Sequence, residues 1–79
     1  MPLITIEVLK GVFPPEKKRE IITRITDTMV KIEGEAMRGV TWMRLVETEH
    51  THWAIGGNIP SAADVEAMAR VHENAKATD

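Results

Sequence analysis

Two runs of alternating apolar and polar residues, with one helical pattern between them, most constrain what this chain can fold into. The first run covers residues 1–9, where Ile4, Ile6 and Val8 alternate with other residues, and the second covers Gly39 to Glu47. Roughly 29 residues separate the two runs, which is the length of a right-handed crossover between strands of one sheet. The sequence therefore predicts two parallel strands joined by a helix.

The connecting segment has the apolar period of an amphipathic helix from Glu16 to Glu33. Pro15 suits the first helical position, and Gly34 is a good stop after the last turn. The apolar residues of the predicted stripe are Ile21, Ile22, Ile25, Met29 and Ile32. One helix covers one face of a sheet, whereas parallel strands need cover on both faces. We therefore expect a second subunit to cover the other face.

Size and composition also favour association. The chain has 79 residues and no cysteine, so a domain of this length is marginally stable alone and has no disulfide to support it. We expect a homo-oligomer. The net charge of −2, with both signs interspersed, gives no electrostatic reason to bind nucleic acid or a membrane surface. No long apolar run or secretory leader is apparent, which makes the cytoplasm the expected location.

After Glu47 the sequence predicts a polar loop, a small hairpin and a final helix. Residues 48–52 are polar, and residues 53–60 form an apolar piece broken by Gly56-Gly57. Ser61 and Asp64 have the spacing of a capping box, so a helix is predicted from there to about Ala75, with residues 76–79 frayed. The predicted fold is a single α/β domain over residues 1–79, with a βαβ core over 2–60 and a helical extension over 61–79, completed by oligomerisation.

The loop before the hairpin contains two histidines that deserve a test as metal ligands. His50 and His52 alternate along the segment, with Glu47 and Glu49 nearby, and imidazoles are common zinc ligands. No third ligand has a defined spacing, and histidines in such a loop are more often simply exposed. We therefore predict no metal and no cofactor.

Proline as the second residue is unusual in a strand. Initiator methionine is normally removed ahead of proline, which would leave Pro2 as a free secondary amine at the tip of a half-buried strand. Such an amine could act as a base or a nucleophile. The alternative is that Pro2 is chemically silent, as most second-position prolines are.

The strand that begins with Pro2, the helix opening with Glu16, the second strand and the segment His52-Trp53-Ala54-Ile55-Gly56-Gly57 together resemble the 4-oxalocrotonate tautomerase family. The resemblance covers about residues 2–60. It implies that Pro2 is a general base that moves a proton between carbons of an enol acid as the keto form appears. It also implies a homo-hexamer built as three dimers and a small enol or keto acid as substrate.

The sequence departs from the family at its two substrate-binding arginines, whose places are taken by Val12 and Trp42. Arg44, two residues beyond Trp42 on the same strand face, and Arg38, at the entrance of the strand, are candidates to bind the substrate carboxylate in their stead. Each has a plainer alternative, an intersubunit salt bridge for Arg44 and a solvated loop position for Arg38. Lys10 is a weaker candidate.

The two tryptophans are candidates for the apolar wall of the site. Trp53 stands where the family has the aromatic residue that walls the proline pocket. Trp42 is either such a wall or a core or interface residue, because aromatic side chains concentrate in interfaces. With two arginines missing, we expect a substrate with one carboxylate or an aromatic enol.

Two classes of function stay open at this point. The first is an enzyme with Pro2 as the base, either a tautomerase or one of the decarboxylases and hydratases that also resemble this family. The second is a non-catalytic subunit of a tautomerase-like oligomer, which the missing arginines favour.

Overall fold

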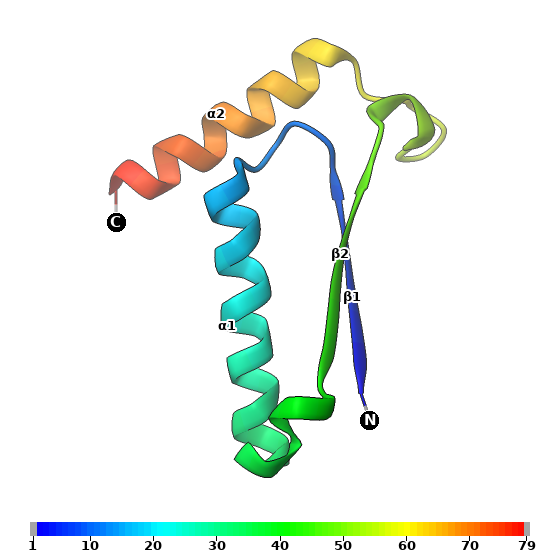
Figure 1. Cartoon of the computed structure of the whole chain (residues 1–79). Coiled ribbons are helices and arrows are strands. Elements are labelled where there is room, and N and C mark those ends of the chain that lie inside the picture. Colours follow the sequence, from blue (N-terminus) through cyan, green and yellow to red (C-terminus); the bar gives the residue numbers. More distant parts are fainter. Residues whose placement is uncertain (1, 79) are drawn as a thin grey trace. The chain divides into compact units, whose positions relative to one another are not determined.

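The computed structural model describes the backbone of residues 2–78 and the side chains of residues 2–71 (Figure 1). The elements in chain order are β1 (Leu3–Leu9), α1 (Pro15–Glu33), the 3-10 helix η1 (Glu35–Val40), β2 (Trp42–Thr48), the 3-10 turn η2 (His50–His52) and α2 (Ala62–Thr78). The order β1-α1-β2 followed by a C-terminal helix confirms the predicted α/β fold.

Chain contacts divide the molecule into two units, which are described separately. The first comprises β1 up to Ile6 and residues Pro15–Val46, and the second comprises Glu7–Pro14 and the chain from Glu47 onward. Neither described helix is both long and apolar enough to cross a membrane.

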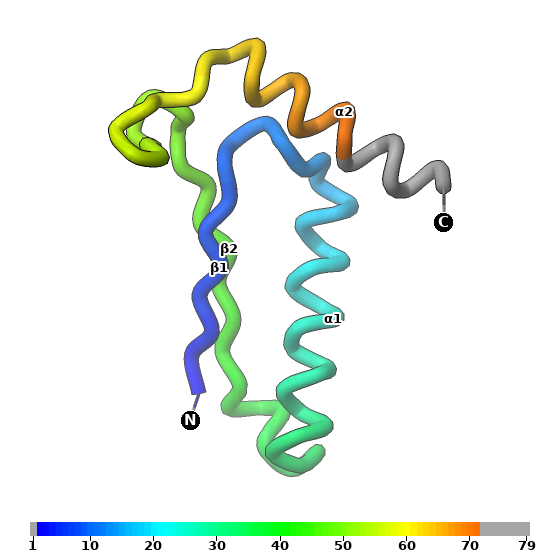
Figure 2. Tube along the Cα trace, turned by 180° about the vertical axis from the view of Figure 1, so that it is seen from behind, coloured from blue at the N-terminus to red at the C-terminus, as the bar shows by residue number. Residues whose placement is uncertain are grey.

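The two strands form a parallel two-stranded sheet, as predicted. At one end the backbone N–H of Trp42 donates to the carbonyl of Pro2 at 2.9 Å, and at the other the N–H of Lys10 donates to the carbonyl of Thr48 at 2.9 Å. In a parallel ladder these bonds pair Leu3 with Trp42. Figures 1 and 2 show the strands running side by side in the same direction.

The sheet residues of the first unit alternate in exposure along both strands. Ile4, Ile6, Met43 and Leu45 are half-buried, and their neighbours along the strands are exposed except for Val46, which is also half-buried. We call the exposed set the outer face; within the first unit it consists of Leu3, Thr5, Trp42 and Arg44. The alternation is the pattern of a sheet that is covered on one side only within this chain.

Helix α1 begins at Pro15 and ends before Gly34, both as predicted. Gly34 has a φ of 109°, which a glycine adopts without strain, and its N–H donates to the carbonyl of Val30 at 2.7 Å. Two residues of the predicted stripe are exposed, Ile32 at 76% and Ile25 at 38%, whereas Val30, which was not part of that stripe, is 1% exposed. The apolar band of this helix is wider than the face that one chain can bury, so one edge of the band is left outside.

The second strand begins three residues later than predicted. Gly39 and Val40 belong to η1, although Val40 and Thr41 are β-branched and read as strand. The N–H of Thr41 donates to the carbonyl of Arg38 at 3.2 Å, and its single hydroxyl hydrogen is shared between two acceptors, the carbonyl of Met37 at 2.9 Å and the carboxylate of Glu33. These contacts stabilise a 3-10 turn where local propensity alone indicates extended chain.

In the second unit, the predicted hairpin is reduced to one antiparallel bridge. Ile55 and Asn58 exchange two backbone hydrogen bonds of 2.9 Å around Gly56 and Gly57. Both glycines have positive φ, 59° and 86°, as a type I′ turn requires. The predicted polar loop before the hairpin contains the turn η2.

The predicted capping box at the start of α2 is confirmed. The N–H of Asp64 donates to the Ser61 hydroxyl at 3.1 Å, and the N–H of Ser61 donates to the Asp64 carboxylate at 2.9 Å. The helix continues to Thr78, beyond the predicted end at Ala75. Of the segment predicted to fray, Asp79 lies outside the described residues.

The capping box leads to a pH-dependent prediction. The backbone N–H of Ser61, and after it the Ser61 hydroxyl, hold the pKa of Asp64 below its usual value. A lowered pKa means that the carboxylate stabilises the fold fully above the unfolded-state pKa of about 3.9 and loses this effect as pH falls through the lower folded-state pKa. We expect Asp64→Asn to lower the urea midpoint at pH 7. At a pH below both pKa values the gap to wild type closes; an unchanged gap there would contradict the prediction.

Candidate active site

Pro2 is fixed at the open end of the parallel sheet. Its carbonyl accepts the 2.9 Å hydrogen bond from Trp42, and the residue is half-buried. Because exposure alternates from Pro2 through Leu3 to Ile4, Pro2 continues the covered side of β1. The backbone at this position is therefore anchored by the neighbouring strand immediately ahead of the first paired residue.

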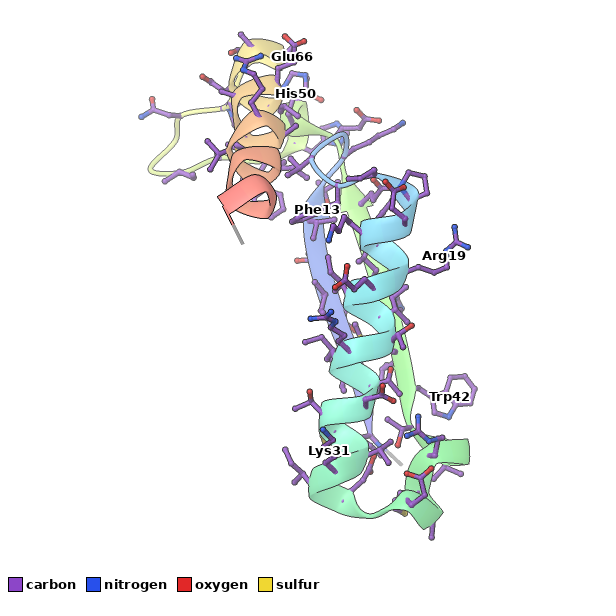
Figure 3. All side chains as sticks on the ribbon, turned by 90° about the vertical axis from the view of Figure 1, so that its left-hand side faces the viewer. Phe13, Arg19, Lys31, Trp42, His50 and Glu66 are labelled. Carbon is purple, nitrogen blue, oxygen red and sulfur yellow. The ribbon has the colours of Figure 1, made fainter. Side chains whose placement is uncertain are left out.

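The first residue of β2 presents an exposed indole. Trp42 is 57% exposed, and Figure 3 shows its ring projecting away from the ribbon. Leu3, its partner in the ladder, is 59% exposed. The sheet end beside Pro2 therefore exposes two large apolar side chains together, and soluble proteins rarely leave adjoining apolar side chains exposed to water.

Arg44 lies on the same outer face, two residues further along β2. It is exposed, and within the described part of the chain no hydrogen bond or ion pair engages its guanidinium. The ladder places it opposite Thr5, a neutral residue. Its guanidinium is therefore available to an anion from outside the chain.

Arg38, the other predicted carboxylate ligand, is engaged within the first unit. Its Nε donates to Glu35 at 2.8 Å, and one terminal nitrogen donates to Asp27 at 2.9 Å. A third bond of 3.3 Å makes the pair with Glu35 bidentate. The hydrogen bonds to Glu35, and after them the bond to Asp27, raise the pKa of Arg38 above its ordinary value. The hydrogen bonding between Arg38 and Glu35 also lowers the pKa of Glu35. A substrate carboxylate would have to compete with both acidic groups.

Trp53 and the remaining predicted residues belong to the second unit. Trp53 is half-buried and follows η2 directly, with its N–H donating to the carbonyl of His50 at 3.2 Å. Lys10 pairs with Glu49 at 3.1 Å through exposed side chains, so it too has an acidic partner. Of the predicted residues, the first unit therefore holds Pro2, Trp42, Arg44 and Arg38. The ladder places the backbone of Trp42 next to Pro2, with Arg44 two residues further along β2 on the outer face.

One residue with a defined contact was missed by sequence reasoning. His50 was expected to be an exposed loop histidine, but it is half-buried and its Nδ1 lies 2.7 Å from the carbonyl oxygen of Pro60. No local pattern in the sequence signals a bond to a backbone carbonyl ten residues away. Within the described residues there is no cluster of three or more histidine and acidic side chains that could hold a metal ion.

Comparison with known proteins now gives the family. The family model described as "Tautomerase enzyme" matches residues 2–63, which span β1, α1, β2, the hairpin and the start of α2. This chain belongs to the tautomerase family. Membership of this family implies isomerase activity of the tautomerase type. No curated protein matches the chain.

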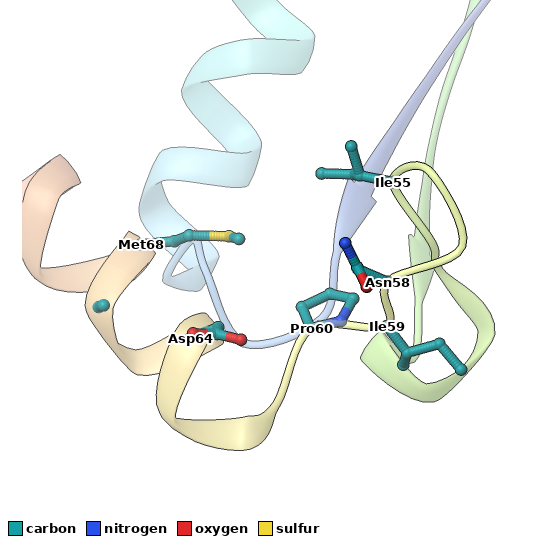
Figure 4. A pocket seen from close by; sticks show the side chains of 7 residues that line it. Ile55, Asn58, Ile59, Pro60, Asp64 and Met68 are labelled. Carbon is teal, nitrogen blue, oxygen red and sulfur yellow. The ribbon is translucent and has the colours of Figure 1, made fainter.

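The second unit of this tautomerase also contains an open cavity of about 340 Å³ (Figure 4). It is lined by the hairpin and the start of α2, through Ile55, Asn58, Ile59, Pro60, Asp64, Ala67 and Met68. None of the site residues predicted from the sequence lines it. The carboxylate of Asp64 is already bonded to Ser61, which leaves a mainly apolar hollow without a free charged group.

Proposed function

We propose that this tautomerase catalyses enol–keto proton transfer on a small acid with one carboxylate, as a cytoplasmic enzyme of the 4-oxalocrotonate tautomerase type. The nitrogen of Pro2, freed by removal of Met1, is the general base. In the oligomer, Arg44 binds the carboxylate, and Trp42 and Trp53, which neighbouring copies can contribute, form the apolar wall. The observation that carries the proposal is the ladder bond from the backbone N–H of Trp42 to the carbonyl of Pro2, which anchors the proline at the sheet end next to a residue whose indole is exposed.

The chemistry of a secondary amine fits this role. An α-amino group has an ordinary pKa of about 7.7 to 8.0, and burial or a nearby cation lowers that pKa because each disfavours the protonated form. A base with a pKa near the working pH is unprotonated for much of the time and still strong enough to take the proton of an activated carbon acid. The enol hydroxyl proton passes to the base, and a proton is then delivered to the substrate carbon to give the ketone.

The charge distribution supports Arg44 over Arg38 as the carboxylate ligand. Arg38 has two acidic partners in its own unit, whereas Arg44 has no partner in the described chain. An arginine can hold a carboxylate through two parallel hydrogen bonds, which orients the substrate as well as binding it. A single arginine of this kind suits a substrate with one carboxylate.

The outer face supports an oligomeric site. Pro2 continues the covered side of β1, whereas the side chains of Trp42 and Arg44 belong to the outer face. Within one chain, these side chains and the proline ring therefore lie on opposite faces of the sheet. We propose that the outer face meets a second copy of the chain, in a hexamer of three dimers, and that Arg44 serves the proline of a neighbouring copy.

The experiment is a ketonisation assay with two substrates, on protein whose intact mass shows loss of Met1. We expect phenylenolpyruvate, which has one carboxylate, to be converted with a higher kcat/KM than a dienol with two carboxylates. A reversed preference would contradict the assignment of a single carboxylate-binding arginine. Absence of any rate above buffer with either substrate would favour the non-catalytic alternative, which the residues Val12 and Trp42 support.

A further inference from the structure

The segment of the second unit that carries Trp53 is closed into a loop by a hydrogen bond from the His50 side chain. It runs from η2 through Trp53 and the Ile55–Asn58 bridge to Pro60. The backbone hydrogen bonds within it are local: the N–H of Trp53 donates to the carbonyl of His50, and Ile55 and Asn58 bond each other. The contact that joins its two ends is the 2.7 Å bond between His50 Nδ1 and the carbonyl oxygen of Pro60.

The chemistry of this contact determines where the imidazole proton lies. A carbonyl oxygen only accepts hydrogen bonds, so Nδ1 of His50 must carry the hydrogen. The neutral form is therefore the Nδ1–H tautomer, and the imidazolium form also donates from Nδ1. The bond consequently persists whether the ring is neutral or charged.

Both ends of the segment are attached to ordered structure. Pro60 directly precedes Ser61, whose capping box with Asp64 fixes the first turn of α2. At the other end, Glu49 precedes His50 and pairs with Lys10. The hydrogen bond between His50 and Pro60 closes the chain between these two points into a loop, which removes conformational freedom from the residues within it.

We propose that His50 is a positioning residue that holds Trp53 in place by clamping the segment 50–60 onto the start of α2. The role in catalysis rests on the proposed function, in which Trp53 walls the proline site. The clamp itself does not, because it concerns only the orientation and solvent access of one indole.

The test uses Trp53 as its own reporter. The chain has two tryptophans, so Trp42→Phe leaves Trp53 as the single indole. In this background we expect His50→Leu, which has no donor, to increase acrylamide quenching of Trp53 about twofold, since the loop that carries it is released. His50→Asn retains an N–H donor near the Nδ1 position and is expected to restore most of the protection. His52→Leu is the matched control, because His52 is exposed on the same turn and its imidazole has no partner in the described chain.

Activity is measured separately, with Trp42 in place. We expect His50→Leu to lower kcat/KM for phenylenolpyruvate about tenfold, because a small displacement of a wall residue misplaces the substrate. His50→Asn should recover most of this loss. Equal quenching in the Leu, Asn and control variants would overturn the clamp. A quenching change without measurable activity in any variant would leave the clamp supported and count against the proposed function.

A measurement on the unmutated protein guards against misfolding of the variants. The ¹⁵N chemical shifts of the His50 ring distinguish protonated from unprotonated nitrogens. A hydrogen on Nδ1 at a pH where the ring is neutral supports the clamp, and an unprotonated Nδ1 would overturn it.

Discussion

Adding one alanine ahead of Pro2 is expected to lower kcat/KM for phenylenolpyruvate by about 10²- to 10⁴-fold, the range by which a positioned general base accelerates proton transfer. The extra residue keeps the proline ring but converts its nitrogen into an amide, which has no lone pair available for a proton. The backbone carbonyl of Pro2, which accepts from Trp42, is left unchanged. The loss is therefore expected in kcat without a matching loss of stability.

Pro2→Ala is the companion variant, since it retains a terminal amine but replaces the secondary amine by a primary one. We expect its activity to fall between those of the extended and the native chains. Intact mass must show the terminus of each form, and a thermal melt must show that each is folded. Native kcat/KM in the extended chain would disprove the role of Pro2 as base, whatever the alanine variant does.

Arg44→Gln is expected to raise KM for a monocarboxylate substrate by about 10- to 100-fold, the equivalent of a lost hydrogen bond to a charged group. Glutamine keeps a polar side chain of similar reach but cannot form the bidentate, charge-assisted pair. Because Arg44 is exposed and unpartnered in the described chain, its removal leaves no carboxylate of this chain without a counter-ion. KM is measured by steady-state ketonisation kinetics.

Arg38→Gln is the matched control, because Arg38 has the same chemistry but is bonded to Glu35 and Asp27. It is expected to lower the melting temperature, since it removes contacts between α1 and η1, with little change in KM. If Arg38→Gln raises KM and Arg44→Gln does not, the two roles are reversed and the ion pairs of Arg38 must open for substrate.

Periodicity was sufficient to predict the order of elements. The parallel pairing followed from the length of the segment between the strands, and the capping box followed from the spacing of Ser61 and Asp64. The start of β2 was predicted wrongly because Val40 favours a strand locally, whereas η1 is stabilised by contacts with α1. Such contacts between segments leave no periodic trace in the sequence.

The same limit applies to the candidate site. Pro2, Trp42 and Arg44 could be selected because the strand period and the family resemblance assign them, and the ladder then sets Trp42 beside Pro2. The bond from Arg38 to Asp27 and the bond from His50 to Pro60 could not be predicted, because their partners are 11 and 10 residues away and no spacing rule specifies them. Ile32 was placed on the apolar stripe but is exposed, because a helical period identifies an apolar band and not how much of it one chain covers.

The way Trp42 is held has a consequence for how enzymes of this kind diversify. Its backbone N–H donates a hydrogen bond to the carbonyl of Pro2. Its side chain is 57% exposed and therefore contributes little to the interior of its own chain. A change of side chain at this position therefore leaves the monomer's packing almost untouched. In the proposed site Trp42 forms part of the apolar wall, so substitutions there are expected to change substrate preference with little effect on the packing within one chain, which makes position 42 a starting point for directed evolution.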